Sequence, residues 1–384
     1  MIPSLGAGGR RGASWRFEAL QALDWPLFAV LAVIAGGGML MQASISGGSL
    51  DPWAGAHGLR FLMAVGVAIV IGLTPLPWWL RLAYPIYGMT LLLLLGVEFF
   101  GDERLGAQRW LQIGPMSLQP SEIMKIAIVL ATARAVHDTP TALLGSLRAS
   151  LLPLGLIIAP VGLVAHQPDL GTSILVAISG LSIVFLSGLK WPVIAVAGLG
   201  GAIAGPLFVM FGLKDYQRER VLTFLDPGRD PLGAGYHITQ SKIAIGNGGW
   251  TGAGIGQGTQ SRLDFLPEQH TDFIFTALAE ETGFVGVMVL IGLFGFVFLR
   301  LMAIGADCRN LFGRMVASGV AVTIISYVLI NMAMVSGLIP VVGVPLPLVS
   351  YGGTAMLTVM VGIGLALSAR NGAAMTMPPM SSLI

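Results

Sequence analysis

Three ionisable side chains lie close together where a polar stretch of the chain runs into an apolar one. Glu268, His270 and Asp272 fall within the sequence FLPEQHTDFIF. Ionisable residues at the edge of a spanning segment are costly and are functional candidates by default. We expect Asp272 to be a general base that takes a proton from an attacking hydroxyl. The alternative is that Asp272 or Thr271 only caps the following helix.

His270 and Glu268 are candidate substrate-binding residues because they lie beside Asp272 in the sequence. The alternative for His270 is a hydrogen-bonding residue at the membrane interface. Further along, Glu280 follows Asp272 by just over two helical turns, so it lies near the same stripe of a helix. We expect Glu280 and Glu281 to face the bundle interior and line the cavity. The sequence leaves open whether Glu280 is a proton route or a buried packing group.

A second charged pair lies near the start of another apolar segment. Glu122 and Lys125 are three residues apart, so their side chains share one face of a helix. The two charges neutralise each other, which predicts a structural ion pair. A second role, holding the substrate or orienting Asp272, stays open.

Candidate anion-binding residues occur in the polar stretches. Arg109 and Trp110 lie in GAQRWLQIGP, which we expect to be an outward loop. Arginine can grip a diphosphate in two-pronged fashion, and tryptophan suits either a sugar face or the membrane interface. Arg218 and Lys242 are two further candidate substrate-binding cations in a later polar stretch.

A proline-rich segment lies at a later membrane boundary. It reads GLIPVVGVPLPLVSYGG, covers residues 337–353 and includes Ser350. Irregular backbone at membrane depth is tolerated only where it is buried in protein or lines a wet cavity. We therefore expect this segment, Ser350 included, to shape the same outward-facing pocket.

Several other classes of site are excluded by the sequence. The glycine run GNGGWTGAGIGQG lacks the lysine of a phosphate-binding loop and follows no strand, so we interpret it as a close-packed surface loop. The formal net charge of +2 is too small to indicate a nucleic-acid partner. The lone Cys308 excludes an internal disulfide and a cysteine-built metal site, and we expect a reduced bystander thiol in a cytoplasmic turn.

The elements that must position these residues are spanning helices. Apolar residues make up 55% of the chain and charged residues only 10%. Apolar runs recur at lengths that cross a bilayer as helices of about 20 residues. The sequence therefore predicts an all-α membrane bundle of about ten spans. The expected spans are residues 25–43, 59–80, 82–100, 121–136, 147–165, 169–188, 191–213, 273–299, 315–335 and 347–369.

Basic residues in the short loops predict the orientation, because such residues concentrate on the cytoplasmic side. With ten alternating spans they fall on one side, which places both termini in the cytoplasm: Arg10, Arg11, Arg16, Arg81, Arg134, Arg148, Lys190, Arg300, Arg309, Arg314 and Arg370. The predicted organisation is a cytoplasmic segment 1–24, one membrane domain 25–370 and a cytoplasmic tail 371–384. Residues 214–271 form one large outer loop between spans 7 and 8, with an interfacial helix at YHITQSKIAI.

Five blocks of the sequence resemble the hallmark segments of the SEDS family (shape, elongation, division, sporulation) of cell-wall glycan polymerases. They are GAQRWLQIGPMSLQPSEIMKI, QPDLG, FLDPGRDPLGAGYHITQSKIAIGNGGW, FLPEQHTDFIF with AEETGFVG, and GLIPVVGVPLPLVSYGG. The resemblance runs from Asp24 to Arg370. GTQSRLDFLPE and NMAMVSGLIPVVGVPLPL are more similar to the elongation branch of the family than to the division branch.

The resemblance implies a ten-span glycosyltransferase that polymerises lipid II at the outer face of the bacterial inner membrane. Implied partners are lipid II, the polyprenyl-diphosphate-linked glycan, a class B penicillin-binding protein and the membrane proteins of the elongation complex. The essential aspartate of the family falls on Asp272, its intramembrane pair on Glu122 and Lys125, and its outer-loop arginine and tryptophan on Arg109 and Trp110. A divalent cation, Mg or Mn, is implied as an aid, although no compact set of metal ligands is visible in the sequence.

Two other classes of function stay open from the residues alone. A helical bundle with interior charges also suits a flippase or transporter of the lipid-linked precursor, and Glu280 and Glu281 are the residues that favour it. A scaffold without chemistry is the third class. A flippase should carry polar groups through its whole depth, whereas here they gather near the outer face.

Overall fold

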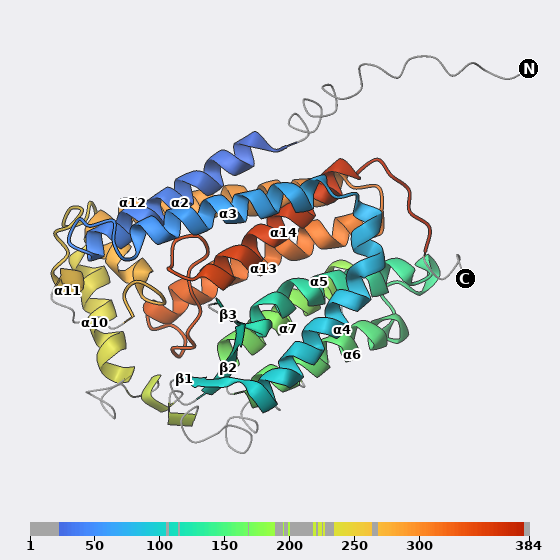
Figure 1. Ribbon diagram of the computed structural model, residues 1–384, viewed down its shortest axis with the longest axis horizontal. Helices are drawn as coiled ribbons and strands as arrows, with labels where there is room; N and C mark the ends of the chain where they lie inside the picture. Colours follow the sequence, from blue (N-terminus) through green and yellow to red (C-terminus); the bar gives the residue numbers. More distant parts are fainter. Residues whose placement is uncertain are drawn as a thin grey trace, which may run out of the picture.

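The computed structural model describes residues 23–379 except 105–106, 114–115, 168, 263–267 and most of 189–233. Within these residues the protein is a bundle of long helices (Figure 1). The first half contributes α2 (Trp25–Ile45), α3 (Ala54–Leu73), α4 (Leu76–Phe100), α5 (Pro120–Asp138), the 3-10 turn η1 (Thr141–Leu143), α6 (Leu147–His166) and α7 (Leu170–Leu186). The second half contributes α10 (Ala234–Asn247), α11 (Thr259–Arg262), α12 (Ile274–Asp307), α13 (Leu311–Val335) and α14 (Gly353–Asn371).

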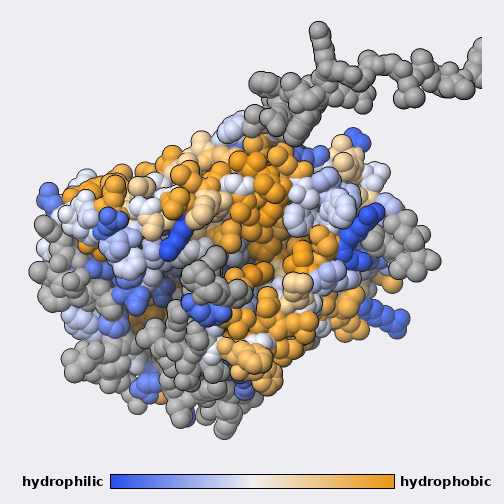
Figure 2. All heavy atoms as spheres, viewed as in Figure 1, coloured by the Kyte–Doolittle hydropathy of each residue, from blue (hydrophilic) through white to orange (hydrophobic). Residues whose placement is uncertain are grey.

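Seven helices of the described part are long and apolar enough to cross a membrane, namely α2, α3, α4, α6, α12, α13 and α14. The apolar helix α7 is shorter. Figure 2 shows apolar side chains across the middle of the visible face, with hydrophilic ones toward its ends. The chain is therefore a multi-pass membrane protein. The count of ten spans stays a prediction, because the expected span 191–213 lies almost wholly outside the described residues.

The expected spans match the helices closely in four cases and miss a boundary in others. The second predicted span, 59–80, is wrong because it crosses the junction between α3 and α4. Thr74 ends α3 and Pro75 precedes α4, and the residue before a proline is disfavoured in a helix. The tenth predicted span begins too early, since residues 347–352 are not helical and α14 begins at Gly353.

The fold is mostly helical, as expected, but one connection between two helices is not. A small antiparallel sheet of strands β1 (Asp102–Arg104), β2 (Ala107–Ile113) and β3 (Met116–Leu118) connects α4 to α5, with β2 in the centre. Its register pairs Asp102 with Trp110 and Leu111 with Leu118. The sheet contacts α4 and α5 through β2, so it is anchored on the bundle.

The helix α12 is two helices joined at Gly283. Gly283 has φ 65° and ψ −165°, a conformation open to glycine. Residues 274–281, before this break, are all buried. After the break, Phe284, Val285 and Met288 are exposed on the apolar surface. The break therefore separates a short buried segment, which follows Asp272 directly, from a long segment that faces the lipid.

Three of the basic residues that predicted the orientation, Arg134, Arg300 and Arg370, lie at one end of the bundle. Asp24 caps α2 and pairs with Arg300 of α12 at 2.7 Å and with Arg370 of α14 at 3.6 Å. Arg134, near the end of α5, donates to the carbonyl of Leu80 at the start of α4. The segments α10 and α11 lie at the opposite end, at the left of Figure 1.

Candidate functional site

Asp272 lies in a short segment whose backbone is fixed by three other parts of the chain. The carbonyl of His270 accepts from Nε2 of Gln42 at 2.9 Å and from the amide of Tyr351 at 2.8 Å. The carbonyl of Thr271 accepts from Oγ of Ser350 at 2.6 Å. The carbonyl of Asp272 itself accepts from Nδ2 of Asn331 at 2.9 Å. These four donors hold the aspartate backbone from α2, α13 and the segment before α14.

The side chain of Asp272 is partly buried and faces the proline-rich segment. Its Oδ2 would lie 3.4 Å from a Cβ built on Gly343, which has φ 70°. Asn331 connects the two segments, since its Nδ2 also donates to the carbonyl of Val344 at 2.7 Å. The proline-rich segment therefore lies beside the aspartate, and its role in shaping an outward-facing pocket stays a prediction.

Thr271 and Asp272 directly precede α12, whose N-cap residue is Phe273. Thr271 donates its hydroxyl to the carbonyl and Oε2 of Glu268, at 3.1 and 2.9 Å. The alternative that Asp272 caps the helix stays open beside its proposed role as a base.

Two aromatic rings pack against His270 at the same end of the bundle. Trp53, directly before α3, stacks on His270 with ring centroids 4.3 Å apart and planes at 14°. Tyr351 meets Trp53 edge-on at 4.7 Å. The guanidinium of Arg60, on α3, lies 4.2 Å from the centre of the Tyr351 ring. Sequence reasoning did not single out these partners of His270, because α3 and residue 351 lie far from it in the chain.

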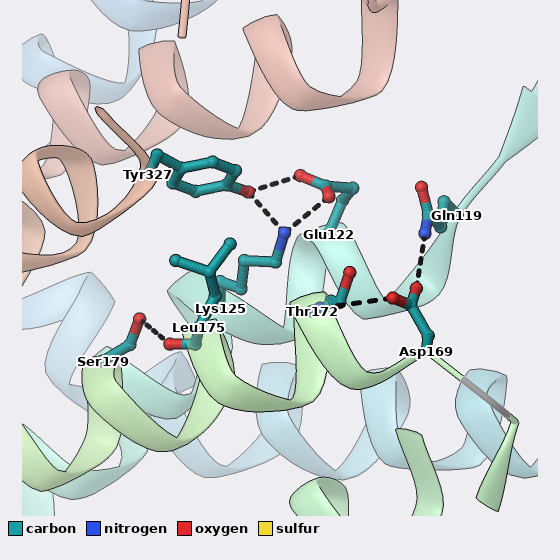
Figure 3. A network of polar contacts seen from close by, with 8 residues as sticks. All are labelled: Gln119, Glu122, Lys125, Asp169, Thr172, Leu175, Ser179 and Tyr327. Atoms are coloured by element: carbon teal, nitrogen blue, oxygen red, sulfur yellow. Dashed lines mark hydrogen bonds and ion pairs between the residues drawn. The ribbon is translucent and has the colours of Figure 1, made fainter. Parts of the chain in front are cut away.

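The charged pair expected on α5 is formed, and it has a third member (Figure 3). Nζ of Lys125 lies 2.5 Å from Oε1 of Glu122 and 2.5 Å from the hydroxyl of Tyr327 on α13. That hydroxyl donates to Oε2 of Glu122 at 2.6 Å. All three side chains are nearly or fully buried. The three side chains thus form a closed triangle, in which each polar group contacts both of the others.

The triangle is connected to the aspartate through α13. Asn331 follows Tyr327 by one helical turn, which is a rise of about 6 Å along the axis. Val344, whose carbonyl binds Asn331, packs with Tyr327 in one apolar cluster. The network therefore supports the helix turn that holds the backbone of Asp272, and this contact favours an orienting role for Glu122 and Lys125.

Asp169 caps α7. Its Oδ1 accepts from the amide of Thr172 at 3.2 Å at the start of α7, and its Oδ2 accepts from Gln119 at 3.2 Å (Figure 3). Gln119 directly precedes α5. Asp169 therefore ties the outer ends of α5 and α7 together.

The carboxylates of Glu280 and Glu281 contact α11 and the glycine run that precedes it. Oε1 of Glu280 accepts from the amide of Gln260 at 2.9 Å and from the hydroxyl of Thr259 at 3.1 Å. The carboxylate of Glu281 accepts from Oγ of Ser44 at 2.7 Å and from the amide of Gly256 at 3.0 Å. These contacts favour the packing role for both carboxylates over a proton route.

The glycine run itself closes around the break in α12. The amide of Ala253 donates to the carbonyl of Glu280, and the amide of Phe284 donates to the carbonyl of Gly249, both at 2.9 Å. A Cβ at Gly252 would collide with the backbone of Glu281. The interpretation of this run as a close-packed loop is confirmed.

The remaining candidate residues are more dispersed. Arg109 and Trp110 are partly buried and lie on strand β2 of the connection between α4 and α5, and their position on the outer side stays a prediction. Lys242 lies on α10, and its side chain packs over Gly337 at the start of the proline-rich segment. Glu268 is exposed and has φ 51°. Arg218 is exposed in a stretch of which few residues are described, so its role stays a prediction.

Ser350 is buried, and its hydroxyl both donates to Thr271 and accepts from the amide of Leu346 at 2.7 Å. It therefore supports the wall of the site. Within the described residues, no group of three or more His, Cys, Asp and Glu side chains is arranged to hold a metal ion. The need for a divalent cation stays a prediction. An apolar groove of about 440 Å³ lies between α2 and α3, lined by residues such as Ala35, Gly58 and Leu62.

Comparison with known proteins gives concordant matches. The family model of the cell cycle proteins FtsW, RodA and SpoVE matches residues 24–373. Peptidoglycan glycosyltransferase MrdB of Escherichia coli K12 is 49% identical over 311 residues, which are 80% of this chain and 83% of that protein. The probable peptidoglycan glycosyltransferase FtsW of Aliivibrio salmonicida is 35% identical over 316 residues, 81% of this chain and 78% of that protein.

Solved structures give the same result. A chain from a peptidoglycan synthase complex, in a study of how polymerisation and crosslinking are coordinated, matches with a TM-score of 0.78 and 35% identity. The match covers 92% of this chain and 99% of that one. The rod shape determining protein RodA of Thermus thermophilus matches with a TM-score of 0.68 and 29% identity, over 92% of this chain and 98% of that one.

Proposed function

The chain belongs to the SEDS family of FtsW, RodA and SpoVE proteins, and we propose that it is a peptidoglycan glycosyltransferase that polymerises lipid II during cell elongation. The similarity to MrdB, 49% against 35% for the FtsW relative, supports the elongation branch. We place the reaction at the outer face of the bacterial inner membrane.

The observation that carries the proposal is the fixed position of Asp272. A general base must be held within hydrogen-bond reach of the proton that it takes, and a rigid support reduces the cost of reaching that geometry. The carbonyls of residues 270, 271 and 272 are all bound by donors from other elements. Because these hydrogen bonds fix the backbone, the carboxylate of Asp272 is preorganised to take a proton.

In the reaction, the carboxylate of Asp272 takes the proton of the acceptor 4-hydroxyl. The hydroxyl oxygen forms a bond to the anomeric carbon of the donor glycan as the bond from that carbon to the polyprenyl diphosphate breaks. The diphosphate leaves with the electron pair, and the transfer inverts the configuration at the anomeric carbon. Arg109, with other outer basic residues, balances the charge that develops on the diphosphate.

The buried network has a supporting role in this proposal. Glu122, Lys125 and Tyr327 form a closed network that fixes α5 against α13. Asn331, one turn along α13, then binds the carbonyl of Asp272. The network keeps the base in register with the substrate without touching it.

The partner that we propose is a class B penicillin-binding protein, with other membrane proteins of the elongation complex. The similar solved chain comes from a peptidoglycan synthase complex, which supports this choice. Gly292 and Gly295 of α12 border open space and leave room for a partner's spanning helix. Gly319 of α13 is inside the bundle instead, where a Cβ would meet Ile183 and Val129.

The flippase alternative loses the residues that favoured it. The carboxylate of Glu280 binds α11, and that of Glu281 binds the glycine run and Ser44. The test is to give the purified protein lipid II in detergent and to look for glycan strands that lysozyme degrades. We expect strands from the single purified protein or from its complex with the penicillin-binding protein. Movement of lipid II between leaflets without any strands would contradict the proposal.

A further inference from the structure

Arg60 and the aromatic rings beside it form a cluster that has no role in the reaction as proposed. We define the α3 cluster as Trp53, Arg60, His270 and Tyr351. We propose that this cluster binds the diphosphate and first sugar of one of the two lipid-linked substrates, while Arg109 on the sheet serves the other. The inference rests on the proposed function, because only a polymerase needs two such substrates at one base.

The charge of Arg60 is the first argument. The ion pairs within the described part of the chain do not include Arg60, and its guanidinium contacts the Tyr351 ring. A cation over an aromatic face keeps its charge and its hydrogen-bond donors for another partner. Arg60 is only partly buried and lies about two turns into α3 from the outer end. A phosphate group at the membrane interface is the partner that matches this depth and this charge.

The aromatic rings are the second argument. Trp53, His270 and Tyr351 form one contiguous surface through the stacked and edge-on contacts, and each ring is partly exposed. Binding sites for small molecules combine such apolar and aromatic surfaces with a few polar groups. A sugar ring attached to a diphosphate would cover the rings while the arginine binds the phosphates.

The position relative to the base is the third argument. The backbones of His270 and Tyr351 are hydrogen-bonded to each other at 2.8 Å, and Asp272 follows His270 by two residues. The cluster therefore lies beside the base on the α3 and α14 side. Arg109 lies on β2, which packs on α4 and α5. In Figure 1, α3 and the sheet lie on opposite sides of α13 and α14. Two anion sites on opposite sides of this helix pair match a donor and an acceptor.

The test measures binding without turnover. Asp272→Asn protein is titrated with a lipid II analogue that carries a short, detergent-soluble polyprenyl chain, and the stoichiometry is measured by calorimetry. We expect two molecules of analogue per protein. Arg60→Gln should leave one site and weaken the other by about tenfold or more, since hydrogen bonds to charged groups contribute this much. Arg60→Lys should give an intermediate loss, because it keeps the charge without the fork. Arg148→Gln, at an exposed arginine elsewhere, is the matched control.

Three outcomes would overturn the inference. One is an unchanged stoichiometry in Arg60→Gln protein that keeps the melting temperature of its parent. Another is binding of only one analogue molecule by the Asp272→Asn protein that keeps Arg60. The third is equal displacement of the analogue by phosphatidylglycerol, which would make the cluster a site for any lipid phosphate. Binding can be measured whether or not the wild-type protein makes strands, so failure of the inference and failure of the proposed function give different results.

Discussion

The spacing of residues along the chain predicts some contacts of the site and not others. Glu122 and Lys125 were predictable as a pair, because an i,i+3 spacing on a helix brings two side chains together. Tyr327, the third member, lies 202 residues from Lys125 and is a common type of residue in an apolar helix. Gln42 and Asn331 were detectable only as polar residues within apolar helices, which is a signal for interhelical hydrogen bonds without naming the partner.

The Tyr327 hydroxyl gives a prediction at this scale. Tyr327→Phe removes a donor to Glu122 and an acceptor of Lys125 but keeps the ring. We expect a moderate loss of stability, about 1–3 kcal/mol for buried groups left unsatisfied. Lys125→Met should cost more, about 3–5 kcal/mol, because it leaves a buried carboxylate uncompensated.

The check is thermal unfolding in detergent together with polymerisation by the folded fraction. Thr323→Val, at another buried hydroxyl of α13, is a control for the loss of a hydroxyl outside the network. If Tyr327→Phe protein matched the wild type in both stability and turnover, the supporting role of the network would be wrong.

Cys308 gives a prediction about pH. Burial is the main cause that raises the pKa of this thiol to about 11; Arg314 opposes the shift and Asp307 adds to it. The thiol is 1% exposed and donates to the carbonyl of Ile304. Because the thiolate is the reactive form, we expect little labelling by a maleimide at pH 8 and faster labelling as the pH approaches 11. Full labelling within minutes at pH 8, without denaturant, would contradict the buried position.

At the scale of elements, long apolar runs were the most predictable part of the fold. The bounds of α2, α5, α6 and α7 agree with the expected spans to within a few residues. The break at Gly283 was not predictable, because glycine is common in spanning helices and its effect depends on a loop about thirty residues earlier. The sheet was missed because its strands are short and no hydrophobic alternation marks them.

The packing of the glycine run on this break can be tested by adding single methyl groups. Gly252→Ala would place a Cβ against the backbone of Glu281 at a φ of 81°, and both effects are unfavourable. We expect a loss of about 1–3 kcal/mol and lower polymerisation, since the run also holds Glu280 and Glu281. Gly246→Ala is the matched control, because a Cβ there meets nothing within 4 Å and α10 is helical at this position. The control should be neutral or slightly stabilising. Equal melting temperatures for the two variants would contradict the close packing.

At the scale of the whole molecule, the end-to-end separation of charges predicts the orientation in the membrane. Replacing Cys308 with serine gives a cysteine-free protein in which single cysteines can report each side. Trp250→Cys is at the end that carries α10 and is 74% exposed, and Met375→Cys, 47% exposed, follows α14. In intact spheroplasts we expect an impermeant maleimide to label position 250 and to label position 375 only after permeabilisation. The reverse labelling pattern would mean that the topology is inverted and that the site does not lie at the outer face.

The catalytic role of Asp272 is tested by polymerisation of lipid II with purified Asp272→Asn and Asp272→Ala proteins. Asparagine keeps the shape of aspartate but cannot take a proton near neutral pH. We predict that both variants lose at least about a hundredfold in rate, the minimum that general-base catalysis commonly supplies, with melting temperatures near that of the wild type. Both should still bind the penicillin-binding protein. Robust strand formation by the Asp272→Asn protein would contradict the central claim and return Glu268 or Glu122 as the candidate base.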